Sequence, residues 1–259
     1  MHPISKLICG QTSDDLSDIK QISDRLNKTI SNFSERLLAL EIKDNDNRLL
    51  APFYARSILE AACTALLLRL DPFRVLSIYK VQSTTQYDIT KKSNVSLLWT
   101  GDILAANKPK DKLWHPENKL TDLDRALLSN YTGDLFWKQG FLKTLDYINN
   151  QDLGLGSNWL NDLKEFDENA FFERSKTESS KLYSAFSKGV HYEFLIEANS
   201  VYDFTTVQNY VNRMFQLIAN LGLISHFIGT MSSRFEKNVS LNLYLEIEEL
   251  IEEWSKITV

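Results

Sequence analysis

The sequence is poor in the residues that interrupt regular secondary structure. It contains 9 Gly and 5 Pro among 259 residues. Both counts are below average usage, which is about 7% for Gly and about 5% for Pro. All-β domains need frequent turns, which depend on these two residues, so their scarcity favours helices. The chain also has only 2 Cys, which excludes a disulfide scaffold and a four-cysteine metal site.

Long apolar runs and excess positive charge are missing as well. The most apolar stretch, 58–68, contains Glu60 and is shorter than the about 20 residues that a membrane span requires. The N-terminal segment reaches the polar run 11–15 too early for a secretory signal. A formal net charge of −5 disfavours a protein that coats nucleic acid without specificity. We therefore expect a soluble, cytoplasmic protein without membrane contact, in which Cys9 and Cys63 are free thiols and Cys63 is a small core residue.

Apolar residues make up 43% of the chain, enough for a proper core, which excludes a disordered protein. Along most of the sequence they recur every three or four positions, the spacing of one face of a helix. We find no repeat at a fixed period and no interdomain linker. The sequence therefore predicts an all-α, single-domain helical bundle over 1–259, with long N-terminal and C-terminal helices and an irregular middle region at about 83–157.

The predicted helices begin and end at recognisable capping residues. In the N-terminal part we expect a long helix from the capping run 12–15 to about Leu40, a central helix over 52–70 with Pro52 in its first turn, and a helix over 72–82 capped by Asp71. Further on we expect a capping box at Thr121–Asp124 and helices over 136–150, from Ser157 to Phe166, over 169–187, over 203–231 with Gly222 as a close-packing point, and over 241–254 with an acidic outer face.

Familiar catalytic and ligand-binding motifs are absent from the sequence. Gly154-Leu155-Gly156 lacks the third glycine of a dinucleotide fingerprint, and neither a phosphate-binding Gly-x-x-x-x-Gly-Lys loop nor a Gly-x-Ser-x-Gly elbow occurs. The run 44–47 lacks the glycine and the closing glutamate of a calcium loop, so we interpret it as a solvated helix end. The four histidines are scattered. We therefore predict no metal, no cofactor and no certain catalytic residue.

Two polar features stand out from apolar surroundings. Arg56 and Glu60 are four residues apart on one face of the most apolar predicted helix. His191 follows Gly189 inside an aromatic segment. A buried charge needs a partner, so His191 or Ser187 is a plausible companion of the Arg56–Glu60 pair. The group is interpreted either as a structural tie across the core or as the lining of a pocket. In the second case the catalytic candidates are Arg56, Glu60 and His191, and the binding candidates are Ser187, Tyr183, Tyr192 and Glu193.

The same two segments resemble HEPN-like helical proteins of bacteria. There, an Arg-x-x-x-Glu helix precedes a Ser-x-x-Val-His segment. Here the corresponding residues are Arg56-Ser57-Ile58-Leu59-Glu60, followed by Asp71-Pro72, and later Tyr183, Ser187, Val190 and His191. The resemblance leaves the first helix and the region 95–165 uncovered. It implies an all-helical fold and a role near phage defence, toxin–antitoxin or RNA-processing systems.

One departure from that family concerns catalysis. Active HEPN ribonucleases carry an Arg-x4-6-His motif, and no histidine of this chain has the required arginine. The positions five, six and seven before His191, for example, are Phe186, Ala185 and Ser184. The resemblance therefore implies a member that acts through binding.

Three functional hypotheses follow from these features. We favour a non-catalytic HEPN-like binding or regulatory module of a bacterial anti-phage defence or stress-response complex, with a protein partner encoded in the same operon and RNA as a further candidate ligand. The first alternative is a metal-independent ribonuclease whose pocket contains Arg56, Glu60 and His191. The second is a homodimeric scaffold that associates through its acidic C-terminal helix or through the aromatic segment 131–141.

Overall fold

The computed structural model describes residues 2–11, 17–91, 95–108, 110–151, 156–188 and 202–257. These residues form helices and turns, with only isolated β-bridges at Thr100, Leu104 and Leu128, so the all-α prediction is confirmed. In chain order the helices are α1 (Pro3–Cys9), α2 (Ser17–Leu38), α3 (Asn45–Leu70), α4 (Pro72–Gln82), α5 (Asn130–Thr132), α6 (Lys138–Asn150), α7 (Asn158–Lys164), α8 (Glu168–Lys188), α9 (Phe204–Ser225) and α10 (Lys237–Ile257), with the short turns η1 (Trp99–Ile103), η2 (Leu120–Asp122) and η3 (Gly133–Trp137).

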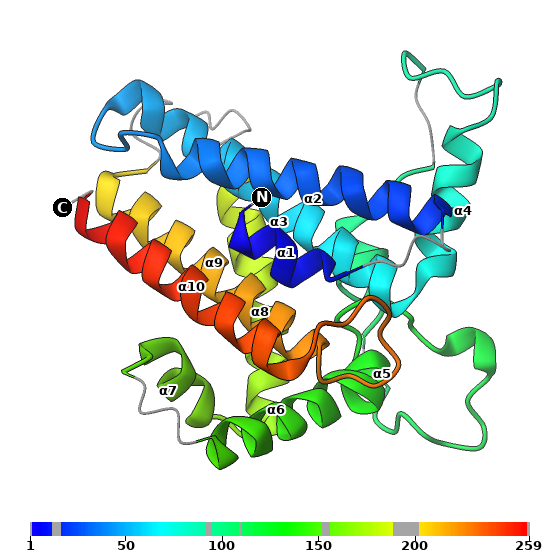
Figure 1. The fold of residues 1–259 in the computed structure, drawn as a ribbon. Coiled ribbons are helices and arrows are strands. Elements are labelled where there is room, and N and C mark those ends of the chain that lie inside the picture. Colours follow the sequence, from blue (N-terminus) through cyan, green and yellow to red (C-terminus); the bar gives the residue numbers. More distant parts are fainter. Residues whose placement is uncertain are drawn as a thin grey trace.

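Helix α3 occupies the centre of the bundle. It packs against α1, α2, α4, α8 and α9, and Figure 1 shows it behind α2, with α9 and α10 side by side on another flank. Its second half is apolar on all sides, and Leu59, Ala62, Cys63 and Leu66 are fully buried. Among the described helices, α3 alone is long and apolar enough to cross a membrane, but more than half of that stretch is buried inside the fold. Its composition is therefore accounted for by the core.

The start of α3 differs from the prediction. The helix begins at Asn45, because the Asp44 carboxylate accepts hydrogen bonds from the backbone N–H groups of Asp46 (2.8 Å) and Asn47 (3.2 Å). The polar run interpreted as a solvated helix end is thus a helix N-terminus. Pro52 lies inside the helix rather than in its first turn, where it removes one backbone hydrogen bond without ending the helix.

The middle of the chain is irregular over a shorter range than predicted. Helices α5 and α6 already occupy most of 130–150. The predicted capping box at Thr121–Asp124 is wrong, since no side chain caps the short turn η2. The box forms instead between Ser129, the N-cap of α5, and Thr132, which exchange hydrogen bonds of 3.0 and 3.2 Å. Helix α4 has the predicted bounds and Asp71 is its N-cap residue, but the Asp71 side chain makes no capping hydrogen bond and pairs with Arg125 instead.

The C-terminal helices also differ in detail from the prediction. Helix α10 begins at Lys237, and its acidic face is not wholly solvated, because Glu248 is buried. The Glu248 carboxylate accepts hydrogen bonds from the Ser157 hydroxyl and from the backbone N–H of Trp159 at the start of α7. The aromatic segment 131–141 is largely internal as well, with Tyr131, Trp137 and Phe141 buried.

Helix α9 ends at Ser225, earlier than predicted, beside a buried arginine. Arg69, the penultimate residue of α3, is 3% exposed. Its guanidinium donates to the Ile8 carbonyl (2.8 Å), the Ser225 hydroxyl (2.7 Å) and the Ser232 carbonyl (3.1 Å). It forms no ion pair with a carboxylate of the described residues. Instead it lies at the C-terminal ends of α1 and α9, where the helix dipoles favour a positive charge.

His226 completes this buried cluster. Its Nδ1 accepts a hydrogen bond from the Phe235 N–H (2.9 Å), so Nε2 carries the proton and donates to the Leu7 carbonyl (2.8 Å). Burial, with the nearby charge of Arg69, lowers the pKa of His226 to about 3. Burial lowers the pKa of Arg69 to about 10, so at neutral pH the arginine is charged and the histidine is neutral.

The same region confirms Gly222 as a close-packing point. A Cβ atom at this position would lie 3.0 Å from side-chain atoms of Leu7 and Ile8. Helix α1 can therefore approach α9 closely, and this approach brings the carbonyls of Leu7 and Ile8 within reach of His226 and Arg69.

Candidate functional site

The structure brings Arg56 and Glu60 of α3 together with Tyr183 of α8. The Arg56 guanidinium bonds the Glu60 carboxylate through Nε (3.0 Å) and the Tyr183 hydroxyl through Nη2 (2.8 Å). Its Cζ lies 4.7 Å from the centre of the Tyr183 ring. The side chains of Arg56 and Glu60 are 24% and 46% exposed, so this pair is not a buried charge and retains part of its hydration.

Trp99 of η1 joins this cluster from a third part of the chain. Its ring stacks on Tyr183, with ring centroids 4.3 Å apart and planes inclined by 5°. The indole N–H is buried and has no hydrogen-bond partner among the described residues. In the sequence, Trp99 lies in the middle region 83–157 that is predicted to be irregular. Its contact with Tyr183 results from tertiary packing, and no local spacing indicates it. We call Arg56, Glu60, Tyr183 and Trp99 the Arg56 cluster.

The remaining predicted site residues do not extend this cluster in the part of the chain that the structure describes. The Ser187 hydroxyl donates to the Tyr183 carbonyl of its own helix (2.6 Å), and Arg56 bonds Glu60 and Tyr183 instead of Ser187. His191, Tyr192 and Glu193 lie outside the described residues. The distance between His191 and Arg56, on which the pocket interpretation depends, therefore stays a prediction.

A hollow lies between α4, the segments 101–108, 110–113 and 121–131, and α8. It has a volume of about 770 Å³, within the range of small-molecule sites. Asp122 and Asp124 are its acidic lining residues. We call it the cationic cavity, because its lining includes five basic side chains: Arg74, Lys108, Lys110, Arg125 and Lys176.

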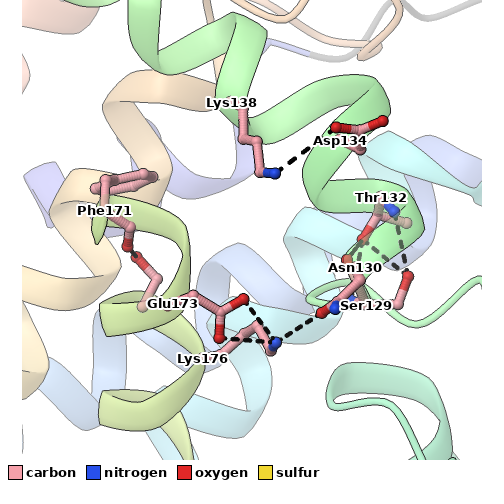
Figure 2. Close-up of polar contacts among 9 residues, drawn as sticks. Ser129, Asn130, Thr132, Asp134, Lys138, Phe171, Glu173 and Lys176 are labelled. Carbon is pink, nitrogen blue, oxygen red and sulfur yellow. Dashed lines mark hydrogen bonds and ion pairs between the residues drawn. The ribbon is translucent and has the colours of Figure 1, made fainter. Parts of the chain in front are cut away.

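Most of these cations have a carboxylate partner, but the partners mostly lie outside the lining. Figure 2 shows one case, in which Lys176 bridges from Glu173 of its own helix (3.0 Å) to the amide oxygen of Asn130 (2.7 Å). Besides the Lys176–Glu173 pair there are three more: Arg74–Asp102 (2.7 Å), Lys110–Asp122 (2.7 Å) and Arg125–Asp71 (2.7 Å). Of the carboxylates in these four pairs, only Asp122 lines the cavity.

A second hollow of about 350 Å³ adjoins the cationic cavity, and we call it the apolar groove. Phe73, Trp114 and Leu135 line it, and each is more than half exposed. Trp114 packs edge-to-face on Tyr131 at 5.2 Å and donates its N–H to Asp134. Tyr131 lines both hollows, and its buried hydroxyl has no hydrogen-bond partner among the described residues.

Sequence reasoning missed both hollows. Lys108 and Lys110 fall in the middle region 83–157 that the sequence predicts to be irregular, and their alternation with other residues is the available indication of a charged surface. Within the described ranges, no group of three His, Cys, Asp or Glu side chains could hold a metal ion.

Comparisons with known proteins identify no relative of this chain. No protein-family model matches the chain, and neither the curated proteins nor the solved structures contain a match. The interpretation of the site therefore depends on the residues and distances given above.

Proposed function

We propose that this chain is a non-catalytic helical binding module that acts in the bacterial cytoplasm as a partner or regulator in a defence or stress-response complex. The resemblance of its Arg56–Glu60 and Tyr183–Ser187 segments to HEPN-like proteins supports the setting. The observation that carries the proposal is the apolar groove, which offers a surface for a protein segment that presents apolar side chains.

The groove combines an apolar patch with the charged residues Asp71, Asp124 and Arg125 in its lining, as in an interface with an apolar centre and a polar rim. Single exposed apolar side chains are common on any protein, but Phe73, Trp114 and Leu135 line one hollow together, and such clusters mark interaction sites. Trp114 is held by Tyr131 and Asp134 before any partner arrives. A preordered aromatic anchor is the residue type that dominates binding energy in interfaces.

A paired capture experiment tests the proposal. Tagged full-length chain is recovered from its host under phage challenge, as the native sequence and with Phe73→Asn and Leu135→Asn combined. Val239→Asn is the matched control, because Val239 is an exposed apolar residue of α10 that does not line the groove. We expect a stoichiometric partner with the native and control chains and its loss with the groove variant. Recovery of the native chain alone would contradict the proposal, as would equal capture by all three.

Light scattering on the purified chain separates a second copy from a foreign partner. A dimer that the Phe73→Asn, Leu135→Asn variant dissociates would replace our proposal by the homodimeric scaffold.

A metal-independent ribonuclease is the second candidate, because the Arg56 guanidinium is partly solvent-accessible beside an acid and a phenol. This candidate predicts RNA cleavage that disappears in His191→Ala while the fold is retained. If total RNA remains intact with the native chain, both alone and with the products of neighbouring genes, this candidate is excluded.

A further inference from the structure

We propose that the cationic cavity is a binding site for a phosphate-bearing small molecule with a ring portion, of which a nucleoside diphosphate is the simplest representative. The site is separate from the Arg56 cluster. The charge, the exposure and the size of the cavity lining support this assignment without the family resemblance or the apolar groove.

The charge of the lining is opposite to that of the whole chain. The protein has 29 basic and 34 acidic residues and a formal net charge of −5. The cavity is lined by five basic residues and only two acidic ones, Asp122 and Asp124. Asp71, Asp102 and Glu173, which pair with three of the cations, do not belong to the lining. Four of the five cations are therefore already paired with a carboxylate, three of which lie outside the lining, and Lys108 has no ion-pair partner among the described residues.

The ion pair that is solvated on both sides can be exchanged for a ligand at small cost. Solvent-exposed pairs contribute at most about 1 kcal/mol, and the Lys110 and Asp122 side chains are each 39% exposed. The Arg74–Asp102 pair is more buried, at 25% and 18% exposed, and stays in place. Lys108 is exposed and has no ion-pair partner among the described residues. A phosphate group can receive charge-assisted hydrogen bonds from the planar guanidinium and the lysine ammonium groups together.

The remaining lining suits the neutral part of such a ligand. Leu104, Leu113, Leu123 and Leu128 supply apolar surface, while Thr177 and Ser180 of α8 supply hydroxyl groups. Inorganic phosphate alone would leave the apolar part of a cavity of about 770 Å³ unfilled. A ring joined to phosphates satisfies both kinds of lining, so a nucleotide fits this site better than either of its halves.

Calorimetric titration of the full-length chain with ADP, GDP, UDP, pyrophosphate and adenosine tests the assignment. We expect at least one nucleoside diphosphate to bind, and to bind at least about tenfold more tightly than pyrophosphate and adenosine. Equal binding of pyrophosphate would reduce the site to an anion site and overturn the ring assignment. Equal binding of adenosine would overturn the phosphate assignment. If no nucleotide binds at millimolar concentration, the proposal is wrong.

Charge-removing variants connect binding to this cavity. Arg125→Gln and Lys108→Gln should each weaken nucleotide binding by about tenfold, the loss expected for one charge-assisted hydrogen bond. Lys28→Gln removes the same charge from an exposed position on α2 outside the lining and should change nothing. Equal weakening by all three variants would show a nonspecific charge effect and contradict the proposal.

Two further measurements distinguish the small-molecule site from an RNA-binding surface and from the apolar groove. Tighter binding of a single-stranded oligoribonucleotide than of any nucleotide, with a steep salt dependence, would assign the surface to RNA and overturn the small-molecule site. The Phe73→Asn, Leu135→Asn variant should retain nucleotide binding. A failed capture experiment and a failed titration are therefore independent results.

Discussion

Two arginines of α3 lie in opposite environments. Arg69 is 3% exposed, and its hydrogen bonds go to backbone carbonyls and a serine at the ends of α1 and α9. Arg56 is partly solvated and bonds a carboxylate and a phenol. The spacing of Arg56 and Glu60 is compatible with either a tie across the core or the lining of a pocket, and in the structure it is Arg69 that forms the buried tie. The difference teaches that full burial with backbone partners marks a structural cation, whereas Arg56 is still accessible to a ligand.

The partners of Arg69 explain how an unpaired charge is tolerated in the core. Burial lowers its pKa to about 10, so the guanidinium remains protonated at neutral pH. The helix C-termini that it contacts supply partial negative charge. Its Nε and Nη1 donate to the Ile8 carbonyl, the Ser225 hydroxyl and the Ser232 carbonyl, and its Nη2 lies 3.4 Å from Nδ1 of His226.

The largest expected effect comes from removing this cation. Arg69→Met should lower the free energy of unfolding by about 3 kcal/mol or more, because it leaves the carbonyls of Ile8 and Ser232 buried without donors. Arg56→Met, the matched substitution on the same helix, should cost less than about 1 kcal/mol, because its ion pair is partly solvated. Urea unfolding followed by circular dichroism measures both. Equal losses would remove the distinction between the two arginines.

A feature can be predicted from the sequence when the residues that form it are close together in the chain, and not when they are far apart. The bounds of α4 and the existence of α8 follow from local apolar spacing and capping residues. The start of α3 differs from the prediction because Asp44 and its neighbours were interpreted as the solvated end of the preceding helix, although the N-cap of the next helix has the same polar composition. The end of α9 was missed because Arg69 and His226 are far apart in sequence.

The candidate site was even less predictable. The pairing of Arg56 with Glu60 follows from their spacing on one helix. The contact of Arg56 with Tyr183, and of Tyr183 with Trp99, requires the packing of three distant segments. The cationic cavity is lined largely by segments without helical periodicity, so local patterns contain no information about which of their side chains converge.

The second prediction concerns the pH dependence of the Arg69 region. The pKa of His226 is lowered from 6.5 to about 3 in the folded chain, so between these values the unfolded chain binds a proton that the folded chain does not. Stability should therefore be fully present above pH 6.5 and fall as the pH decreases, by up to about 1.4 kcal/mol per pH unit from this residue.

His226→Gln isolates that contribution. Glutamine can donate and accept hydrogen bonds without titrating, so the variant should be less stable at pH 7 but lose less stability on acidification than the native chain. The comparison is needed because burial lowers the pKa of His2 to about 4, which gives a slope of the same sign. Parallel pH profiles for the native chain and the variant would show that His226 is not the responsible group.

The third prediction concerns the close approach of α1 to α9, which lets Arg69 and His226 reach the backbone carbonyls of α1. Alanine in place of a helical glycine gains about 1 kcal/mol of helix propensity. At Gly222 this gain should be cancelled or reversed, because the added Cβ would lie 3.0 Å from side-chain atoms of Leu7 and Ile8. Gly229→Ala, in the turn after α9, is the steric control, since nothing lies within 4 Å of a Cβ there. Thermal unfolding of both variants measures the two effects, and a stability gain of about 1 kcal/mol for Gly222→Ala would mean that α1 adjusts without loss.

The smallest expected effect tests the opposite end of α3. Tyr183→Phe removes the hydroxyl that accepts from Arg56 but keeps the ring that stacks on Trp99. A double-mutant cycle with Arg56→Met should therefore give a coupling energy of only about 0.5–1 kcal/mol, the value of one partly solvated hydrogen bond. Urea unfolding of the two single variants and the double variant supplies it. A coupling of several kcal/mol would place Arg56 in the same structural class as Arg69. A small coupling would mean that the Arg56 cluster can exchange its contacts for those of a ligand at little cost in stability.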